Sequence, residues 1–247
     1  YNCIQHSEFG SPNPVDGVSD LILNVAEGNS FIYSGVLRDQ GGKVNLTKTG
    51  PGTQTLRNTG IDHTGPTIVA EGKLIINSDD LHTVLLDIAA GATVEVVTDG
   101  TYGEFENQDA FTLSGAGTFI KSGNDVMSMG WDDGASVAMA PGGLIHIQGG
   151  TMRLEYGVRT TWGTNKGDLT IDAGAALDLW DNNSSDGAYP NAGVFVDSLN
   201  GAGSITRTQD AVGTITVGVD GGDGNFSGAI SNAVGQTNFV KTGTGTQ

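Results

Sequence analysis

The chain is poor in the residues that build disulfide frameworks, zinc sites and nucleic-acid interfaces. Its 247 residues include one cysteine, Cys3, so it can form no intrachain disulfide and offers no cysteine set for zinc. It has 11 lysines and arginines against 28 aspartates and glutamates, for a net charge of −17. Phosphate backbones and anionic membrane surfaces repel such a chain. Nucleic acid is therefore not an expected partner.

Long hydrophobic runs and helical periodicity are missing as well. No apolar run approaches the roughly 20 residues of a membrane-spanning helix, and no basic segment followed by an apolar one opens the chain. Charged residues make up only 16% of the chain and hydrophobic residues 37%, a balance that argues against disorder. The sequence begins without methionine and ends inside a repeat, which predicts a folded segment of a longer protein.

Glycine, by contrast, is abundant, with 40 residues. Residues 41–77 contain three short runs, KVNLTKTG, TQTLRNTG and TIVAEGKLIIN, in which apolar and polar residues alternate as in half-buried strands. Parts of this pattern return along the chain, as SGAGTFIKSGND at 114–125, AGATVEVV at 90–97, GGTMRLEY at 149–156 and AGAALDLW at 173–180. Recurrence of this kind is typical of repeat architectures.

The repeats predict an all-β fold, a single-stranded right-handed parallel β-helix over residues 18–247. The right hand follows from the preference of parallel crossovers for that hand. Residues 1–17, with the sequence SPNP near their end, are expected to cap the first turn, since an uncovered end would expose apolar side chains.

Three segments without strand alternation interrupt the repeats, at 98–110, 157–167 and 181–193. They follow ATVEVV, TMRLEY and ALDLW, which look like equivalent points of the repeat. Because equivalent positions of a solenoid stack above one another, we expect the three loops to emerge on one side and to border a groove.

The stretch KTGPGTQTLRNTG…TGPTIVAEGKLII resembles the autotransporter-associated β-strand repeat of secreted bacterial passenger domains. That resemblance implies a right-handed parallel β-helix and an extracellular location. The chain as a whole, built of such turns with aromatic loops, is similar to the xylan-binding carbohydrate-binding module family 89. This second resemblance implies xylan as the ligand, no catalysis, and covalent linkage to a secreted glycanase.

Aromatic residues gather near the three loops. Trp131, Trp162 and Trp180 are the three tryptophans of the chain, and flat rings beside planar polar groups are typical of glycan sites. Trp162 and Trp180 are 18 residues apart, about one turn of such a repeat, and are expected to lie near each other along the axis as the main platforms for successive sugars. The alternative is that each tryptophan fills the core or covers a corner. The predicted carbohydrate-binding residues are Tyr102, Tyr156, Arg159, Trp162, Asn165, Trp180, Asp181, Asn183 and Tyr189.

The sequence gives weaker support for catalysis and for metal binding. Glycoside hydrolysis needs two carboxylates facing one bond, and the candidates lie in turns where aspartate is common. The four histidines lack metal-ligand spacing. The run from Asp220 to Asn225 could hold Ca²⁺ through oxygens, but an ordinary turn explains it as well. We therefore predict a non-enzymatic polysaccharide-binding domain without a cofactor, the alternatives being an adhesin passenger segment and a polysaccharide lyase or hydrolase. The paired aspartates considered are Asp132 with Asp133, Asp79 with Asp80, and Asp181 with Asp186.

Overall fold

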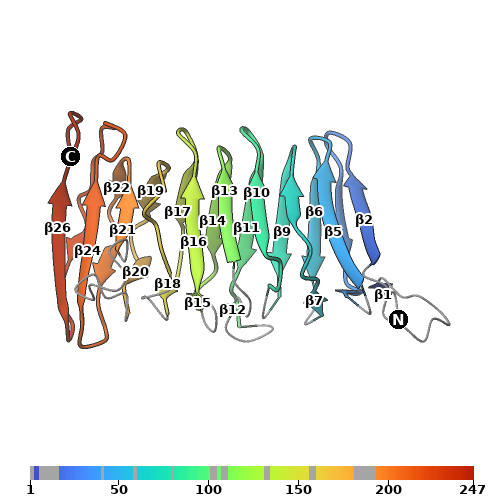
Figure 1. Cartoon of the computed structure of the whole chain (residues 1–247), viewed down its shortest axis with the longest axis horizontal. Coiled ribbons are helices and arrows are strands. Elements are labelled where there is room, and N and C mark those ends of the chain that lie inside the picture. The colour runs from blue at the N-terminus through green and yellow to red at the C-terminus, as the bar shows by residue number, and fades with distance from the viewer. Residues whose placement is uncertain are drawn as a thin grey trace.

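The computed structural model describes residues 3–5, 17–39, 42–57, 60–78, 81–100, 105–106, 111–130, 134–155, 160–180 and 193–247. Throughout these ranges the regular elements are short β-strands, with no helix. The strands follow one another along a single long axis from the N-terminus to the C-terminus (Figure 1). Among the described residues no helix is long and apolar enough to cross a membrane.

The first face of the solenoid is formed by sheet B and, further along the axis, by sheet E. The two are linked by Thr161, which bridges Ser136 on one side and Gly193 on the other. Sheet B contains β2 (Gly17–Asn24), β5 (Gly42–Thr49), β8 (Thr67–Val69), β10 (Leu85–Ile88), β13 (Phe111–Gly115) and β16 (Ala135–Met139), and sheet E contains β21 (Val194–Val196), β24 (Val212–Val217) and β26 (Gln236–Lys241).

The second face is sheet C, which has eight strands and runs almost the full length of the molecule. Its strands are β3 (Ser30–Tyr33), β6 (Thr53–Arg57), β9 (Lys73–Asn77), β11 (Thr93–Val97), β14 (Thr118–Ser122), β17 (Leu144–Ile147), β19 (Asp168–Ile171) and β22 (Leu199–Gly201).

The third face consists of sheet A near the N-terminus and sheet D over the rest of the axis. Sheet A contains β1 (Cys3–Gln5), β4 (Val36–Arg38) and β7 (Ile61–Asp62), and sheet D contains β12 (Phe105–Glu106), β15 (Val126–Met129), β18 (Thr151–Leu154), β20 (Ala176–Asp178), β23 (Ser204–Thr206) and β25 (Ala229–Ile230).

Every strand pairs in parallel with the strand one turn away. On sheet C, for example, Val94 pairs with Phe119, and Phe119 pairs with Ile145. The predicted all-β parallel solenoid is thus confirmed, with about eight turns. Its handedness stays a prediction, as does capping by residues 1–17, most of which lie outside the described ranges.

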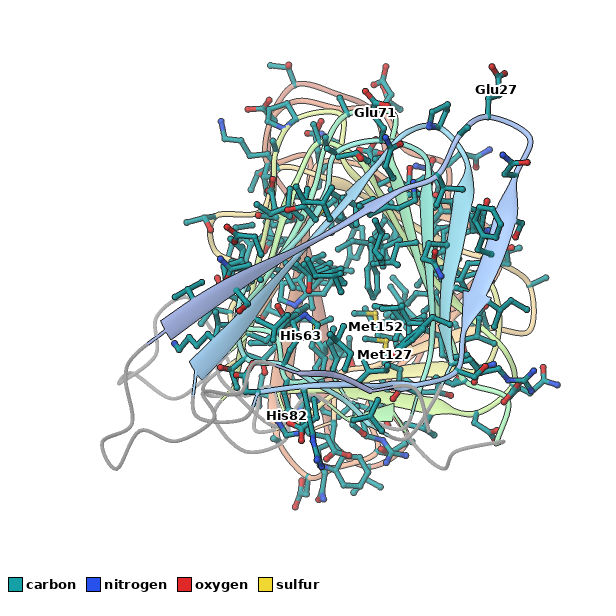
Figure 2. All side chains as sticks on the ribbon, turned by 90° about the vertical axis from the view of Figure 1, so that its right-hand side faces the viewer. Glu27, His63, Glu71, His82, Met127 and Met152 are labelled. Atoms are coloured by element: carbon teal, nitrogen blue, oxygen red, sulfur yellow. The ribbon has the colours of Figure 1, made fainter. Side chains whose placement is uncertain are left out.

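The core is a set of apolar columns that run along the axis inside the three faces. Val94, Phe119 and Ile145 form part of one column and are fully buried. In the view along the axis, side chains fill the interior, and Met127 and Met152 point into it from sheet D (Figure 2). Full burial of each such side chain contributes about 1.5–3 kcal/mol. The expectation that Val, Ile, Leu and Phe point inward therefore holds for the residues of the core, whereas Ile22, Ile32 and Phe239, near the two ends of the solenoid, are exposed.

Two glycines show why the recurring Gly-Ala-Gly segments are needed at corners. Gly115 and Gly201 have φ of 101° and 102°, which residues with a β-carbon rarely adopt. A β-carbon would lie 2.0 Å from the carbonyl oxygen of Ile88 in the first case and 2.1 Å from that of Ile171 in the second. These are the carbonyls of the preceding turn, so glycine permits the close stacking of successive corners.

The predicted equivalence of the three loops is partly wrong. ATVEVV ends in β11 of sheet C, whereas TMRLEY and ALDLW contain β18 and β20 of sheet D. Segment 98–110 therefore starts at a different corner from the other two and includes β12. Residues 160–167, expected to be loop, include the first-face bridge at Thr161. The short alternating runs of these turns look alike in sequence on every face, so the sequence alone did not distinguish the faces.

Candidate functional site

The candidate site lies where the third face passes to the first. Four segments make this connection in successive turns, 107–110, 131–133, 156–159 and 181–192; each follows a sheet D strand, precedes a strand or bridge of the first face and lies outside the described residues. We call this edge of the solenoid the aromatic corner. In sequence its connections contain Trp131, Tyr156, Arg159, Asp181, Asn183 and Tyr189. Tyr102 belongs to 101–104, between the second and third faces, and also lies outside the described part.

Trp180 is the predicted site residue that the structure describes at this corner. It lies at the end of the turn that follows β20 and is partly buried. Its φ is 39°, and it is the one non-glycine residue with a positive φ among those described. Such a conformation costs roughly 1–2 kcal/mol for an L-residue, so it persists only where surrounding contacts fix it.

Three contacts fix Trp180. Its amide donates a hydrogen bond to Oδ1 of Asp178 at 3.0 Å, and its carbonyl accepts one from the guanidinium of Arg207. The guanidinium of Arg153 lies over the indole ring, 4.4 Å from its centroid. A cation over an indole ring contributes about 0.5–2 kcal/mol, depending on exposure. The ring is therefore held in one orientation at the edge of sheet D.

Arg153 is itself held by two buried carboxylates. Its Nη1 lies 3.3 Å from Oε1 of Glu155, and its Nε lies 3.5 Å from Oδ2 of Asp178. Glu155 and Asp178 are 4% and 2% exposed. Asp178 also accepts hydrogen bonds from the amide and hydroxyl of Thr208, one turn further on. The carboxylates of Glu155 and Asp178 thus hold neighbouring side chains in place, and both are withdrawn from solvent.

Two further predicted site residues are buried in the core. Trp162 is fully buried, and Asn165 is 2% exposed. The Asn165 side chain accepts from the amide of Met139 at 3.1 Å and donates to the carbonyl of Phe195 at 2.7 Å, which ties three successive turns together. The prediction that Trp162 is a stacking platform and Asn165 a hydroxyl partner is therefore wrong. The core-filling alternative holds for Trp162.

Trp162 and Trp180 do not lie near each other along the axis as expected, and the reason is topological. The bridges of Thr161 put Trp162 on the first face, in the column shared with Val137 and Val194. Trp180 follows a strand of the third face. A spacing of one repeat implies stacking only when two residues lie on the same face, and these two do not.

Two buried lysines at turns were not predicted from the sequence. Lys48 and Lys121 are fully buried. Nζ of Lys121 donates to the carbonyls of Gly123, Asp125 and, one turn further on, Gly149 at 3.2, 2.6 and 2.6 Å. Lys48 does the same at its own turn, reaching the carbonyl of Glu71. The signal was present as the recurring Lys-x-Gly, but a lysine in a strand ordinarily suggests an exposed position.

A buried histidine occupies the N-terminal half. Nε2 of His63 lies 2.9 Å from the hydroxyl of Thr67, which in turn donates to Thr83. Burial lowers the pKa of His63 to about 4, although the nearby Asp39 opposes the shift. Of the described side chains, no three His, Cys, Asp or Glu are grouped as metal ligands.

The pKa of His63 predicts a loss of stability in acid. Between pH 6.5 and 4 the unfolded chain binds the proton more readily than the folded one, so stability falls as the pH falls through this window. The loss should reach about 2 kcal/mol at pH 5. Urea unfolding of the wild type and of His63→Gln at pH 7 and pH 5 measures it. Equal pH dependence in the two proteins would show that His63 does not titrate as its burial implies.

The run from Asp220 to Asn225 is a turn held by protein groups. The amides of Asp220 and Gly222 both donate to Oδ1 of Asp197 at 2.8 Å. The carboxylate of Asp220 accepts from Nζ of Lys166 at 3.1 Å. These contacts explain the run from Asp220 to Asn225 as a turn stabilised by protein groups.

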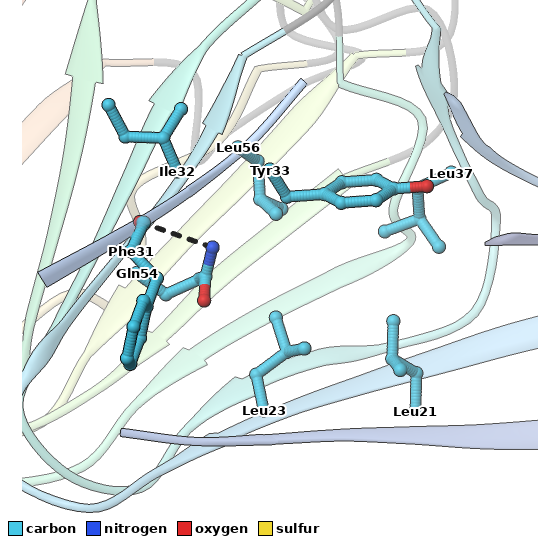
Figure 3. A pocket seen from close by; sticks show the side chains of 8 residues that line it. All are labelled: Leu21, Leu23, Phe31, Ile32, Tyr33, Leu37, Gln54 and Leu56. Carbon is cyan, nitrogen blue, oxygen red and sulfur yellow. Dashed lines mark hydrogen bonds between the residues drawn. The ribbon is translucent and has the colours of Figure 1, made fainter. Parts of the chain in front are cut away.

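An apolar pocket lies at the N-terminal end of the solenoid (Figure 3). It is lined by side chains of the first turns. Its polar side-chain groups are the amide of Gln54, which donates to the carbonyl of Phe31 at 3.3 Å, and the hydroxyl of Tyr33, which donates to the carbonyl of Val36 at 3.1 Å. A glycan offers many hydroxyls and needs several convergent polar groups. With so few polar groups, this pocket at the N-terminal end of the core is a poor glycan site. Its lining residues are Leu21, Leu23, Phe31, Ile32, Tyr33, Leu37, Gln54 and Leu56.

No protein-family model, curated protein or solved structure matches the chain.

Proposed function

We propose that the chain is a non-catalytic carbohydrate-binding module that binds a plant cell-wall polysaccharide, namely xylan, along the aromatic corner. The observation that supports this is Trp180, an aromatic ring fixed in a costly backbone conformation by Asp178, Arg207 and Arg153. A ring pre-oriented in this way lowers the entropy lost when a sugar stacks on it.

The repeated course of the corner adds to the proposal. The sheet D strands that precede these connections succeed one another along the axis, at the spacing of about 4.8 Å between neighbouring strands. The sequences of the connections contain Trp131, Tyr156 and Tyr189. An extended polymer lying along the axis would meet one connection after another, which suits a chain of repeating sugars.

The resemblance to the autotransporter-associated repeat and to family 89 also supports the proposal. It implies a right-handed helix, a secreted bacterial protein and a covalently attached glycanase. An adhesin passenger segment remains the second candidate, since a solenoid of plain turns also serves as a spacer. A lyase or hydrolase is the third, and the burial of Glu155 and Asp178 disfavours these two as a catalytic pair.

Electrophoresis in native gels with and without soluble arabinoxylan tests the proposal. We expect the purified 247-residue chain to be retarded by xylan and not by an equal concentration of dextran. Incubation with xylan should release no reducing ends. Equal mobility in all gels would refute the proposed function, and steady release of reducing ends would favour the enzyme instead.

A further inference from the structure

The two ends of the solenoid expose strand edges and apolar side chains. Among the described strands, β2 begins the first face and β26 ends it, at opposite ends of the axis (Figure 1). Each pairs with a neighbour on one side only, and all pairs along this face are parallel. The outer edges of β2 and β26 are therefore the two complementary edges of a parallel ladder. The exposed apolar residues at these ends are Val18, Ile22, Phe31 and Ile32 near the N-terminus, and Ile230, Val234, Phe239 and Val240 near the C-terminus.

A junction inside the chain shows how two such edges join. Lys48 of β5 is fully buried. It donates to two carbonyls of its own turn and, at 3.1 Å, to the carbonyl of Glu71 in the next. It pairs with Val69, the first residue of the sequence Val-Ala-Glu-Gly at 69–72. The lysine thus connects one turn to the corner of the next.

Both halves of this junction recur, one at each end of the solenoid. The sequence KTGTGTQ at 241–247 differs from KTGPGTQ at 48–54 at one position. Lys241 likewise donates to two carbonyls of its own turn, at 3.2 and 3.3 Å, but no described turn stacks beyond its strand. The sequence VAEG of 69–72 returns at 25–28, in the corner that follows β2.

We propose that copies of this chain associate head to tail, the C-terminal end of one copy stacking on the N-terminal end of the next. In the register of the internal junction Lys241 lies opposite Val25, and its ammonium donates to the carbonyl of Glu27 of the next copy. Glu27 belongs to the end of the solenoid that faces the viewer in Figure 2. A second copy fits this end because it brings both a parallel edge and a lysine in the matching sequence.

The same register closes the apolar ends on each other. Phe239 pairs with Ile215, a core residue of β24, and comes opposite Leu23 of the next copy. Leu23 and Phe31 line the N-terminal pocket (Figure 3), and Phe239 lines a second pocket at the C-terminal end. Stacking removes both pockets from water, which favours association. The net charge of −17 opposes it, so we expect a dissociation constant of about 100 µM. Because two different surfaces meet, the contact gives linear polymers.

Sedimentation equilibrium of the purified chain at about 0.3 M salt, which screens the net charge, tests the proposal. The weight-average mass should rise from about one chain at about 5 µM to about four chains at about 500 µM. Phe31→Asp and Phe239→Asp, one at each end, should remain monomeric. Ile68→Asp is the matched control, since Ile68 is 38% exposed in β8, away from both ends, and it should associate like the wild type. A wild type that stays monomeric overturns the proposal and agrees with capping by residues 1–17. Equal loss of association in the control overturns the role of the ends.

Mixing the two end variants shows which ends meet. Phe31→Asp keeps its C-terminal end intact and Phe239→Asp keeps its N-terminal end intact. Circular dichroism checks that both retain the fold. An equal mixture should therefore form dimers and nothing larger, with a weight-average mass of about one and a half chains at about 250 µM of each. Dimers of either variant alone would show that like ends meet, and a monomeric mixture would show that unlike ends do not; both results overturn head-to-tail association. Neither result depends on whether the chain binds xylan.

Discussion

Replacing Trp180 with alanine is expected to lower the affinity for xylan about tenfold or more and to abolish visible retardation in xylan gels. Stacking on a tryptophan contributes about 0.5–1.5 kcal/mol beyond the apolar area it covers, and burial of that area adds a similar amount. The replacement also removes the ring that Arg153 covers. The ratio of mobilities with and without arabinoxylan measures the loss, and circular dichroism checks that the fold is retained.

Phe31→Ala is the control for this prediction. Phe31 is an aromatic residue that is 54% exposed, and it lies in β3, one of the first strands of the solenoid. Trp180 follows β20, which lies towards the C-terminal end (Figure 1). The Phe31→Ala variant should bind xylan as tightly as the wild type does. Arg153→Lys is informative as well, since lysine keeps the charge but lacks the planar group that orients the indole. We expect it to bind more weakly than the wild type and more tightly than Trp180→Ala. Wild-type retardation of Trp180→Ala would remove this ring from the binding site.

Replacing Lys121 with methionine is expected to destabilise the fold by about 4 kcal/mol. Methionine fills a similar volume but donates no hydrogen bond to the carbonyls of Gly123, Asp125 and Gly149. Each bond from a charged donor is worth about 1.5–3 kcal/mol, and buried acceptors left without a donor carry the full desolvation cost. Relief from burying an ammonium offsets part of that sum. Urea unfolding of the two proteins at pH 7 measures the difference.

Lys241→Met provides the matched control for this loss. Lys241 also follows the Lys-x-Gly pattern and donates to the carbonyls of Thr242 and Gly243, but in the exposed last strand. Water replaces its bonds readily, so the variant should lose little stability. Equal losses in the two variants would show that burial does not govern the role of these lysines.

The lowered pKa of Lys121 also predicts that the stability of the fold depends on pH. Burial lowers its pKa from 10.5 to about 8, although Asp125 opposes the shift. Below pH 8 the lysine is charged in both states, and the cost of burying the charge is fully present. Between pH 8 and 10.5 the unfolded chain binds more protons, so stability rises with pH over this window. The wild type should therefore gain stability relative to Lys121→Met as the pH is raised from 8 to 10.

The sequence by itself determined the class of fold. Alternation in short runs, with glycine at the ends, allows a strand with one buried face and a sharp corner after it. Recurrence of such runs leaves stacked parallel turns as the way to bury every apolar face. Val94 and Phe119 could be placed in the core from this pattern alone, because alternation is a local property of the chain.

Only the tertiary structure decided which face each strand occupies, and the site depends on that. Runs from different faces have the same alternation. The spacing of Trp162 and Trp180 therefore suggested equivalent positions in the repeat, although Trp162 belongs to the first face and Trp180 follows a strand of the third. Turn lengths vary along the chain, and the assignment of a residue to a face depends on the sum of all turns before it. The contacts of Trp180 come from three different turns, and those of Lys121 from two. Contacts of this kind, between residues far apart in sequence, are set by stacking and not by local pattern.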